Sequence, residues 1–176
     1  FYLFFLLQCS QALLRQLPEI TKWRIWECAA GNHKIAEVLE RHGATVFTAD
    51  IMTYSKRHNA IYDFTSDINY RSACDNLITN PPYGKGNRMA VRFVEKALAR
   101  CSGYVALLLT AKFDFGKTRH HFFRDNPRFM KKVALVDRIQ WFPGDTTGTE
   151  DHAWYVWGPQ GHAYTASLAY EGKEAV

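Results

Sequence analysis

The sequence predicts an α/β protein built around an open, mostly parallel sheet. Short apolar runs typical of strands alternate with amphipathic runs typical of helices, and residues 104–110 (YVALLLT) are apolar almost throughout. A strand of a parallel sheet, covered on both faces, has that composition. The 176 residues, 47% of them hydrophobic, match the size of one globular domain, 1–176. We expect right-handed crossovers between the parallel strands.

Predicted strands occupy the apolar or alternating runs, which in chain order are 24–29, 44–49, 76–79, 104–110, 133–142 and 153–157. The last two are separated by residues 143–152, a segment rich in Gly, Thr and Asp without a helical pattern. Antiparallel strands can be joined without a crossover helix, whereas parallel strands cannot. We therefore expect an antiparallel hairpin at one edge of the sheet.

Helices are predicted between the strands. Residues 33–42 place Ile35, Val38 and Leu39 on one face, and residues 87–101 repeat apolar side chains at helical spacing. These amphipathic patterns predict helices that pack on the faces of the sheet.

The apolar opening of the chain predicts a further helix within residues 1–20, packed on the domain. Its first apolar run, 1–7, is much shorter than the ~20 residues of a membrane span. It also lacks the basic residues and cleavage site of a signal peptide. Since the chain does not begin with methionine, further residues can precede this helix. We expect neither a membrane anchor nor a membrane partner.

Charge and cysteine content narrow the class of protein. The formal net charge is +5 and the isoelectric point is about 9.0, which suits a polyanionic partner without proving one. The four cysteines are widely spaced and include no Cys-x-x-Cys pair. We therefore expect no disulfide framework and no metal site, and a cytoplasmic location.

A turn of small residues follows the first predicted strand, Glu27-Cys28-Ala29-Ala30-Gly31. Ligands of doubly wound folds bind where the first strand turns into its helix. Small side chains there let the backbone approach a ligand closely. The fingerprint G-x-G-x-x-G is absent, and His33 stands where a second glycine would be, so the turn is a poor match to a dinucleotide site.

Two acidic residues follow at informative positions. Asp50 ends the next predicted strand, about twenty residues after the turn, where a carboxylate can accept the hydroxyls of a ribose. In Asp63-Phe64, an acid able to accept from an adenine amino group precedes a ring that can pack on the base. Taken separately, each acid fits a helix cap or a solvated turn equally well. Their order and spacing together favour an adenosine site.

The string Asn80-Pro81-Pro82-Tyr83 is the most specific motif in the chain. Each proline fixes its own φ and restricts the residue before it, which predicts a stiff, extended loop at the end of a strand. The Asn80 side-chain oxygen and the Pro81 carbonyl can accept both hydrogens of one –NH₂ group, so that its lone pair points towards a methyl donor. Tyr83 can stack on a base. The alternative is an ordinary turn ending at Gly84.

These strings together resemble the amino-methyltransferases with a Rossmann-like fold, in particular phage- and prophage-type adenine-specific DNA methyltransferases. The resemblance covers residues 24–158, and its strings are 26–31, 46–51, 63–64 and 79–83. The cofactor motif precedes the Asn-Pro-Pro-Tyr loop, as in the γ-like order. The resemblance implies a class I methyltransferase fold: a mostly parallel seven-stranded sheet with an antiparallel edge hairpin and helices on both faces. No segment resembles a separate target-recognition domain.

The resemblance also implies a cofactor, a reaction and roles for individual residues. The cofactor is S-adenosyl-L-methionine, and the reaction is in-line methyl transfer to an exocyclic amino nitrogen. The favoured target is N6 of adenine in DNA, on a flipped or unpaired base. The cofactor residues it implies are Glu27, Cys28, Ala29, Ala30, Gly31, Asp50, Ile51, Asp63, Phe64 and Asn80. The residues it implies for the target base are Asn80, Pro81, Pro82 and Tyr83.

Three other functions fit the same motif. A protein glutamine amide or an adenine in RNA also offers a planar –NH₂ group, and a catalytically silent subunit would bind the cofactor alone. A cytosine C5 methyltransferase is disfavoured, because it commonly uses a Pro-Cys pair and the chain has none. The sequence leaves the oligomeric state open.

Residues 112–132 mix cations with aromatic side chains. Lys and Arg on phosphates with rings against bases would suit nucleic acid. An amphipathic helix that buries its phenylalanines fits equally well, so both interpretations stand. Adjacent His120 and His121 point in different directions on a helix and do not form a metal site. Trp141-Phe142 and the loop 143–152 can cover a substrate pocket or belong to an edge strand.

Overall fold

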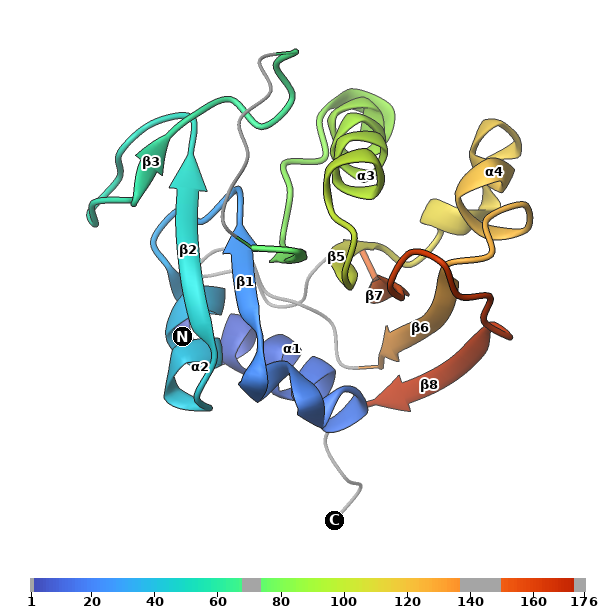
Figure 1. The fold of residues 1–176 in the computed structure, drawn as a ribbon, viewed down its shortest axis with the longest axis horizontal. Helices are drawn as coiled ribbons and strands as arrows, with labels where there is room; N and C mark the ends of the chain where they lie inside the picture. The colour runs from blue at the N-terminus through green and yellow to red at the C-terminus, as the bar shows by residue number, and fades with distance from the viewer. Residues whose placement is uncertain (1, 68–73, 137–149, 173–176) are drawn as a thin grey trace.

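The computed structural model describes residues 2–67, 74–136 and 150–172 (Figure 1). Eight strands form one sheet in the order β3-β2-β1-β4-β5-β7-β6-β8. The strands are β1 Arg24–Glu27, β2 Thr45–Asp50, β3 Ala60–Ile61, β4 Asn76–Thr79, β5 Val105–Thr110, β6 Phe129–Leu135, β7 His152–Trp157 and β8 Ser167–Glu171. The helices are α1 Tyr2–Gln16, α2 Lys34–Arg41, α3 Arg88–Arg100 and α4 His120–Phe123, with short 3-10 turns at Pro18–Lys22, Lys85–Asn87, Phe113–Phe115 and Lys117–Arg119.

The sheet confirms the predicted class and corrects its details. Strands β3, β2, β1, β4 and β5 run parallel, as expected, and β7 runs antiparallel to both β5 and β6. The described sheet has eight strands where seven were expected, because β8 adds to β6 in parallel. The antiparallel pair β6–β7 therefore does not form the edge. All six residues of β7 are buried, which requires neighbours on both sides.

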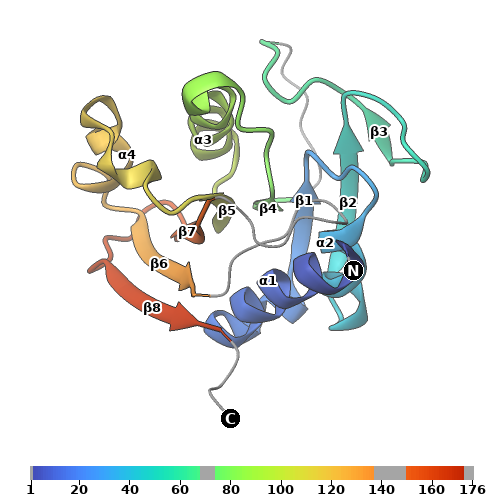
Figure 2. The same ribbon diagram turned by 180° about the vertical axis from the view of Figure 1, so that it is seen from behind.

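Helices cover both faces of the sheet, as predicted (Figures 1 and 2). Alternate side chains of β5 divide between two core clusters: Ala106 and Leu108 pack with α1 and α2, and Leu107 and Leu109 pack with α3 and Phe122 of α4. The alternation follows from the two-residue repeat of a strand. Because β5 is buried on both faces, its carboxyl end is held firmly at the centre of the molecule.

The N-terminal helix belongs to this core. Leu13 is fully buried, and Trp154 on β7 donates its indole N–H to the Cys9 carbonyl over 2.8 Å. Near the end of α1, Arg15 and Gln16 each bond the Glu171 carboxylate at 2.7 Å, which ties the helix to β8. Helix α1 lies within residues 1–20, where a helix was expected, and its buried side chains pack in the core.

Two predicted segments differ from the structure. Strand β6 begins at Phe129, earlier than predicted, and of the predicted strand 133–142 residues 137–142 lie outside the described residues, as do Trp141-Phe142 and most of the loop 143–152. Residues 112–126, for which the sequence favours a helix or a helix followed by a loop, form two 3-10 turns and the one-turn α4. All four cysteines are buried.

Candidate functional site

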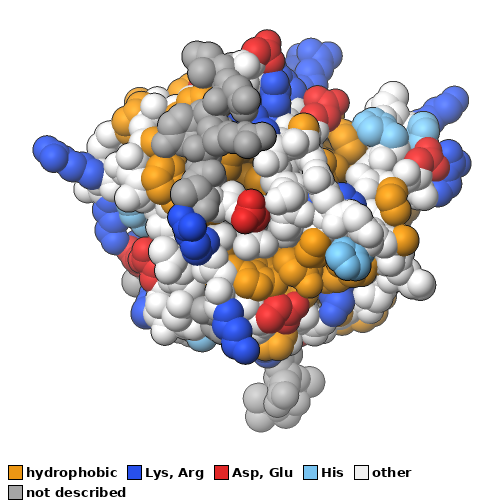
Figure 3. Space-filling model, in the orientation of Figure 1, with side chains coloured by type: hydrophobic (Ala, Val, Ile, Leu, Met, Phe, Trp, Pro, Cys, Tyr) orange, Lys and Arg blue, Asp and Glu red, His pale blue; other side chains and the backbone are white. Residues whose placement is uncertain are grey.

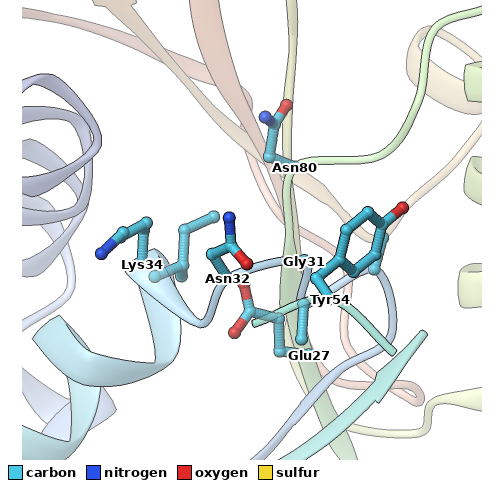
Figure 4. A pocket seen from close by; sticks show the side chains of 9 residues that line it. Glu27, Gly31, Asn32, Lys34, Tyr54 and Asn80 are labelled. Atoms are coloured by element: carbon cyan, nitrogen blue, oxygen red, sulfur yellow. The ribbon is translucent and has the colours of Figure 1, made fainter. Parts of the chain in front are cut away.

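A pocket of about 260 Å³ lies where β1 and β4 end (Figure 4). Carboxyl ends of neighbouring parallel strands meet at one edge of the sheet, so the residues that follow β1, β2 and β4 converge there. The pocket is lined by Glu27, Ala29, Ala30, Gly31, Asn32, Lys34, Ile35, Tyr54 and Asn80. The structure thus brings the predicted turn and the predicted catalytic asparagine to one cavity.

The turn between β1 and α2 has the backbone that its small residues allow. Gly31 has a φ of +48°, and no described atom lies within 4 Å of the position that a Cβ would take. The amide of Ala30 bonds the Ala49 carbonyl at 3.0 Å, and that of His33 bonds the Ala30 carbonyl at 2.7 Å. The turn is therefore tight and open to the pocket at Gly31.

Asp50 fixes this turn to the end of β2. Its carboxylate is 8% exposed and accepts the N–H groups of Gly31 at 2.9 Å and of Ile51 at 2.7 Å. Asp50 itself is not among the described residues that line the pocket. Ile51, the next residue, is 61% exposed. Asp50 thus ties the turn after β1 to the end of β2.

Glu27 provides a buried carboxylate in the pocket wall. It is 1% exposed, and its Oε2 accepts the Ala36 N–H in the first turn of α2 at 3.0 Å. Burial raises the pKa of Glu27 well above its usual value, and the Ala36 N–H partly opposes this shift. A cationic group bound in the pocket would stabilise the ionised carboxylate. Asn80 lies on the far side of the pocket from Glu27, with Asn32 and Tyr54 between them in the view of Figure 4.

Cys28 points away from this chemistry. Its side chain is buried beside Thr79, burial raises the pKa of the thiol well above its usual value, and it is not among the described pocket residues. A buried thiol of raised pKa is a poor nucleophile.

Asp63 and Phe64 also lie apart from the described pocket lining. Asp63 is exposed and accepts the N–H and hydroxyl of Thr65, each at 2.8 Å, which makes it a local turn cap. Phe64 is 2% exposed and packs edge-on against Trp26 with ring centroids 5.1 Å apart. In this structure Phe64 fills the core beneath α3.

The Asn-Pro-Pro-Tyr loop leaves β4 with Asn80 half-buried in the pocket. Pro81 is buried and Pro82 is exposed. The Tyr83 hydroxyl lies 3.2 Å from Asn80 Oδ1 and 3.4 Å from the Leu108 carbonyl oxygen, two acceptors that share one proton. Burial raises the pKa of Tyr83, so this proton is retained.

The Tyr83 ring is packed rather than open. It stacks on His152 at the start of β7, with centroids 5.7 Å apart and planes 26° from parallel. His152 is 2% exposed, and burial lowers its pKa, which favours the neutral imidazole. Sequence reasoning did not single out His152, because its proximity to Tyr83 arises from the insertion of β7 beside β5.

Four pocket residues were missed by the sequence analysis: Asn32, Lys34, Ile35 and Tyr54. The first three directly follow Gly31, so their position in the turn was an available signal. Tyr54 lies in the segment after β2, and β2 ends at the same edge of the sheet as β1 and β4. No periodic pattern in that segment distinguishes Tyr54 from an ordinary surface tyrosine.

The basic segment 112–132 divides into exposed and structural parts. Figure 3 shows Lys, Arg and His side chains gathered over α4 with acidic groups among them. Arg124 pairs with Asp125, and the buried Arg128 donates to the carbonyls of Gly158 at 2.8 Å, Leu98 at 3.1 Å and Gly103 at 2.7 Å. Arg128 therefore stabilises the fold, whereas Arg124 belongs to an exposed ion pair.

The aromatic residues of this segment divide in the same way. Phe113 and Phe122 are buried, whereas Phe115 is 79% exposed. Lys112 and Lys117 are exposed on either side of Phe115 along the chain. Burial of Phe113 and Phe122 agrees with the packing interpretation for these residues, and nucleic-acid binding by the exposed residues stays a prediction.

Among the described residues, no group of three or more His, Cys, Asp or Glu side chains is suited to a metal ion. None of the helices in the described part of the chain has the length and apolarity to cross a membrane.

The chain has the Rossmann-like fold of class I methyltransferases. It is similar to a protein from Pyrococcus horikoshii provisionally described as an RNA methyltransferase (TM-score 0.64, 16% identity, covering 85% of this chain and 81% of that one). A Listeria monocytogenes protein provisionally described as a class I S-adenosylmethionine-dependent methyltransferase is also similar (TM-score 0.64, 11% identity, covering 94% of this chain and 65% of that one). So is a type I restriction-modification methyltransferase subunit from Streptococcus thermophilus (TM-score 0.63, 11% identity, covering 88% of this chain and 43% of that one).

The chain therefore spans less than half of the Streptococcus thermophilus subunit and somewhat less than two thirds of the Listeria protein. No protein-family model and no curated protein sequence matches it. At these identities, the similarity establishes the fold.

Proposed function

We propose that this protein transfers a methyl group from S-adenosyl-L-methionine to an exocyclic amino nitrogen, with N6 of adenine in DNA as the target. One observation carries the proposal: the turn at Gly31 and the side chain of Asn80 line the same pocket. A methyl donor held at the turn and an amine held by Asn80 would then be neighbours.

The residues of the pocket fit this cofactor. The ammonium and sulfonium groups of S-adenosyl-L-methionine are cationic, and Glu27 supplies a buried carboxylate in the wall. A charge-assisted bond to that carboxylate would offset the unfavourable burial of its charge. Gly31 leaves room for close approach, and the exposed Ile51 beside Asp50 offers an apolar surface to the nucleoside. Cys28, Asp63 and Phe64, which the family resemblance had implied, contribute indirectly through packing and turn geometry.

Asn80 is proposed to bind the amine. Its carbonyl oxygen has two lone pairs, so the contact with the Tyr83 hydroxyl leaves one for a hydrogen of the substrate –NH₂. The Pro81 carbonyl would accept the other hydrogen. This arrangement favours a pyramidal nitrogen with its lone pair towards the methyl donor, and catalysis then consists of positioning and electrostatic stabilisation.

A polynucleotide substrate agrees with the exposed groups near this edge of the sheet. Lys112, Phe115 and Lys117 follow β5, whose end lies beside β4 and the Asn80 loop. Asn87, after that loop, bonds the Thr110 hydroxyl at the end of β5 over 3.3 Å, so the two loops are in contact. Cations would bind phosphates, and the exposed Phe115 ring would stack on an unpaired base. Three structural neighbours are described as parts of type I restriction-modification systems, and we therefore choose DNA as the first substrate to test and RNA as the second.

The test is labelling of DNA, RNA and protein fractions with tritiated S-adenosyl-L-methionine, followed by mass-spectrometric identification of the methylated nucleoside. N6-methyladenine in DNA, absent with Asn80→Ala, supports the proposal. Label in RNA alone or in protein alone overturns the assigned substrate and keeps the reaction class. Cofactor binding without transfer to any fraction indicates a silent subunit, and absence of cofactor binding overturns the function altogether.

A further inference from the structure

The segment between β2 and β3, residues 51–59, forms one wall of the pocket. Tyr54 lines the cavity and is 49% exposed, and Ile51 and Met52 beside it are 61% and 55% exposed. Side chains this apolar are usually covered when a ligand or partner is bound. We call residues 51–59 the Tyr54 loop.

Three residues of the Tyr54 loop contact residues 32–37, at the turn before α2 and in its first half. The Ser55 hydroxyl donates to Asn32 Oδ1 at 2.7 Å, and the Ser55 amide approaches the same oxygen at 3.3 Å. Lys56 pairs with Glu37. His58 Nδ1 lies 2.8 Å from His33 Nε2, so the two histidines are within hydrogen-bond distance. The loop is therefore held from the turn side of the pocket.

The geometry defines the proton positions in the histidine pair. His58 Nε2 lies 3.1 Å from the Met52 carbonyl, which only accepts, so this nitrogen carries the hydrogen. In a neutral His58 the other nitrogen, Nδ1, is then an acceptor. His33 Nε2 must therefore donate to it. His58 thus connects His33 to the beginning of the Tyr54 loop at Met52.

His33 occupies a backbone position that favours glycine. Its φ is +61°, in the left-handed region that few non-glycine residues adopt. The imidazole of His33 makes a contact with His58 that glycine could not make. His33→Gly would therefore relieve the backbone strain and, at the same time, remove the bond that holds the Tyr54 loop.

We infer that the His33–His58 pair is a positioning device that holds the Tyr54 loop against bound S-adenosyl-L-methionine and thereby raises the affinity for it. The identity of the ligand rests on the proposed function. Tyr54 then contacts the cofactor directly, and the two histidines act through the loop.

The pair also makes cofactor binding sensitive to pH. Burial lowers the pKa of His33, and the neighbouring His58 and Lys56 act in the same direction, while Glu37 and Asp50 oppose them. The hydrogen bond persists while one ring is neutral, but two protonated rings would direct N–H groups at each other. The contribution of the pair to affinity is therefore full at neutral pH and is lost as the pH falls below 6.5, the ordinary histidine pKa, towards the lowered pKa of His33. Protonation of Glu27, whose pKa burial raises, weakens binding separately.

The test measures the dissociation constant of S-adenosylhomocysteine by calorimetry at about pH 8 and about pH 5.5, on either side of the histidine range. The variants are His33→Gly, His58→Ala and their combination. The matched control is His42→Gln, which removes a histidine at the opposite end of α2, where Nδ1 contacts the Val38 carbonyl. Amide hydrogen exchange of residues 51–59 without ligand reports the attachment of the loop independently.

At the higher pH, each single variant should bind about threefold to tenfold more weakly, the range for one hydrogen bond. The double variant should bind no more weakly than the singles, its affinity should depend less on pH than that of the unmodified protein, with the contribution of Glu27 remaining, and its loop amides should exchange faster. His42→Gln should behave as the unmodified protein. Full affinity with unchanged pH dependence in His33→Gly overturns the inference and leaves the cofactor assignment in place. Absence of binding by the unmodified protein overturns the cofactor assignment first, and this inference with it.

Discussion

The two sides of the pocket are held by different kinds of interaction. On the turn side, the buried carboxylates of Glu27 and Asp50 accept backbone N–H groups. On the Asn80 side, side chains contact one another: the Tyr83 hydroxyl lies against Asn80 and the Tyr83 ring against His152. Substitutions on the turn side should therefore alter folding and ligand binding together. Substitutions on the Asn80 side should alter turnover with little change in stability.

The largest effect is expected for Asn80→Ala on the reaction rate. Loss of a positioned acceptor should lower kcat by about 10²–10³-fold, as for comparable single groups that act on the transition state. The Tyr83 hydroxyl retains the Leu108 carbonyl, so the free energy of unfolding should change by less than about 1 kcal/mol. Methyl-transfer kinetics, calorimetry with S-adenosylhomocysteine and urea unfolding measure the three quantities. If Asn80→Ala lowered the affinity for S-adenosylhomocysteine as much as it lowered kcat, the proposed difference between the two sides of the pocket would be wrong.

Asp50→Ala should produce the opposite pattern. It leaves the Gly31 and Ile51 N–H groups without their carboxylate, which should lower the free energy of unfolding by about 1–3 kcal/mol. Weaker binding of S-adenosylhomocysteine should accompany the loss. Asp50→Asn keeps an acceptor oxygen and should be milder in both urea unfolding and calorimetry. A stable Asp50→Ala variant with normal affinity would contradict the role assigned to this carboxylate.

Glu27→Gln separates stability from binding on the turn side. Because burial raises the folded-state pKa of Glu27, the folded protein loses stability as the pH rises above 4.5, the ordinary value, towards the folded-state pKa. Glutamine does not titrate, so the variant should equal the unmodified protein at about pH 4 and be the more stable at neutral pH. Its affinity for S-adenosyl-L-methionine should fall about tenfold or more, since a bond to a charged group is lost. Thermal unfolding across pH and calorimetry measure both effects; a variant less stable at neutral pH would refute this account.

Tyr83→Phe should have the smallest effect. It removes the hydroxyl at Asn80 and keeps the ring against His152, so turnover should fall by about twofold to tenfold with cofactor affinity unchanged. Tyr155→Phe is the matched control, because its hydroxyl is also buried but bonds the Ala111 carbonyl and Asp114, each at 2.9 Å. That control should lose stability in urea and retain turnover. A loss of turnover as large as in Asn80→Ala would assign Tyr83 a direct catalytic role.

Local patterns in the sequence predicted those parts of the fold that depend on local composition. Strand 76–79 was predicted with the bounds that β4 has, and the strand that became β5 differs by one residue. An uninterrupted apolar run must be buried on both faces wherever it lies. The Asn80 loop and the Gly31 turn were predicted for the same reason, because proline and glycine restrict or free the backbone irrespective of distant contacts.

Features decided by distant contacts were not predicted. The two-residue β3 and the half-exposed β8 are too short or too polar to show a repeat. The position of β7 between β5 and β6 depends on which strands pair, and the sequence of a strand does not determine its neighbours in the sheet. Asp63-Phe64 had the residue types for an adenine contact, but packing of Phe64 on Trp26 decided its position. Tyr54 reached the pocket through contacts of its loop with α2.

The bonds of Arg128 fix one end of the segment that follows β5. Its planar guanidinium joins α3, Gly103 before β5 and the residue after β7, which a lysine ammonium could not do with the same geometry. Between β5 and Arg128, Phe113 and Phe122 are buried and Asp114 bonds Lys132 and Tyr155, whereas residues 115, 117 and 118 are exposed. Replacing residues 115–118 with loops of other length and charge should leave the sheet undisturbed, which makes this tip the place at which target preference in the proposed reaction can be redesigned without rebuilding the scaffold.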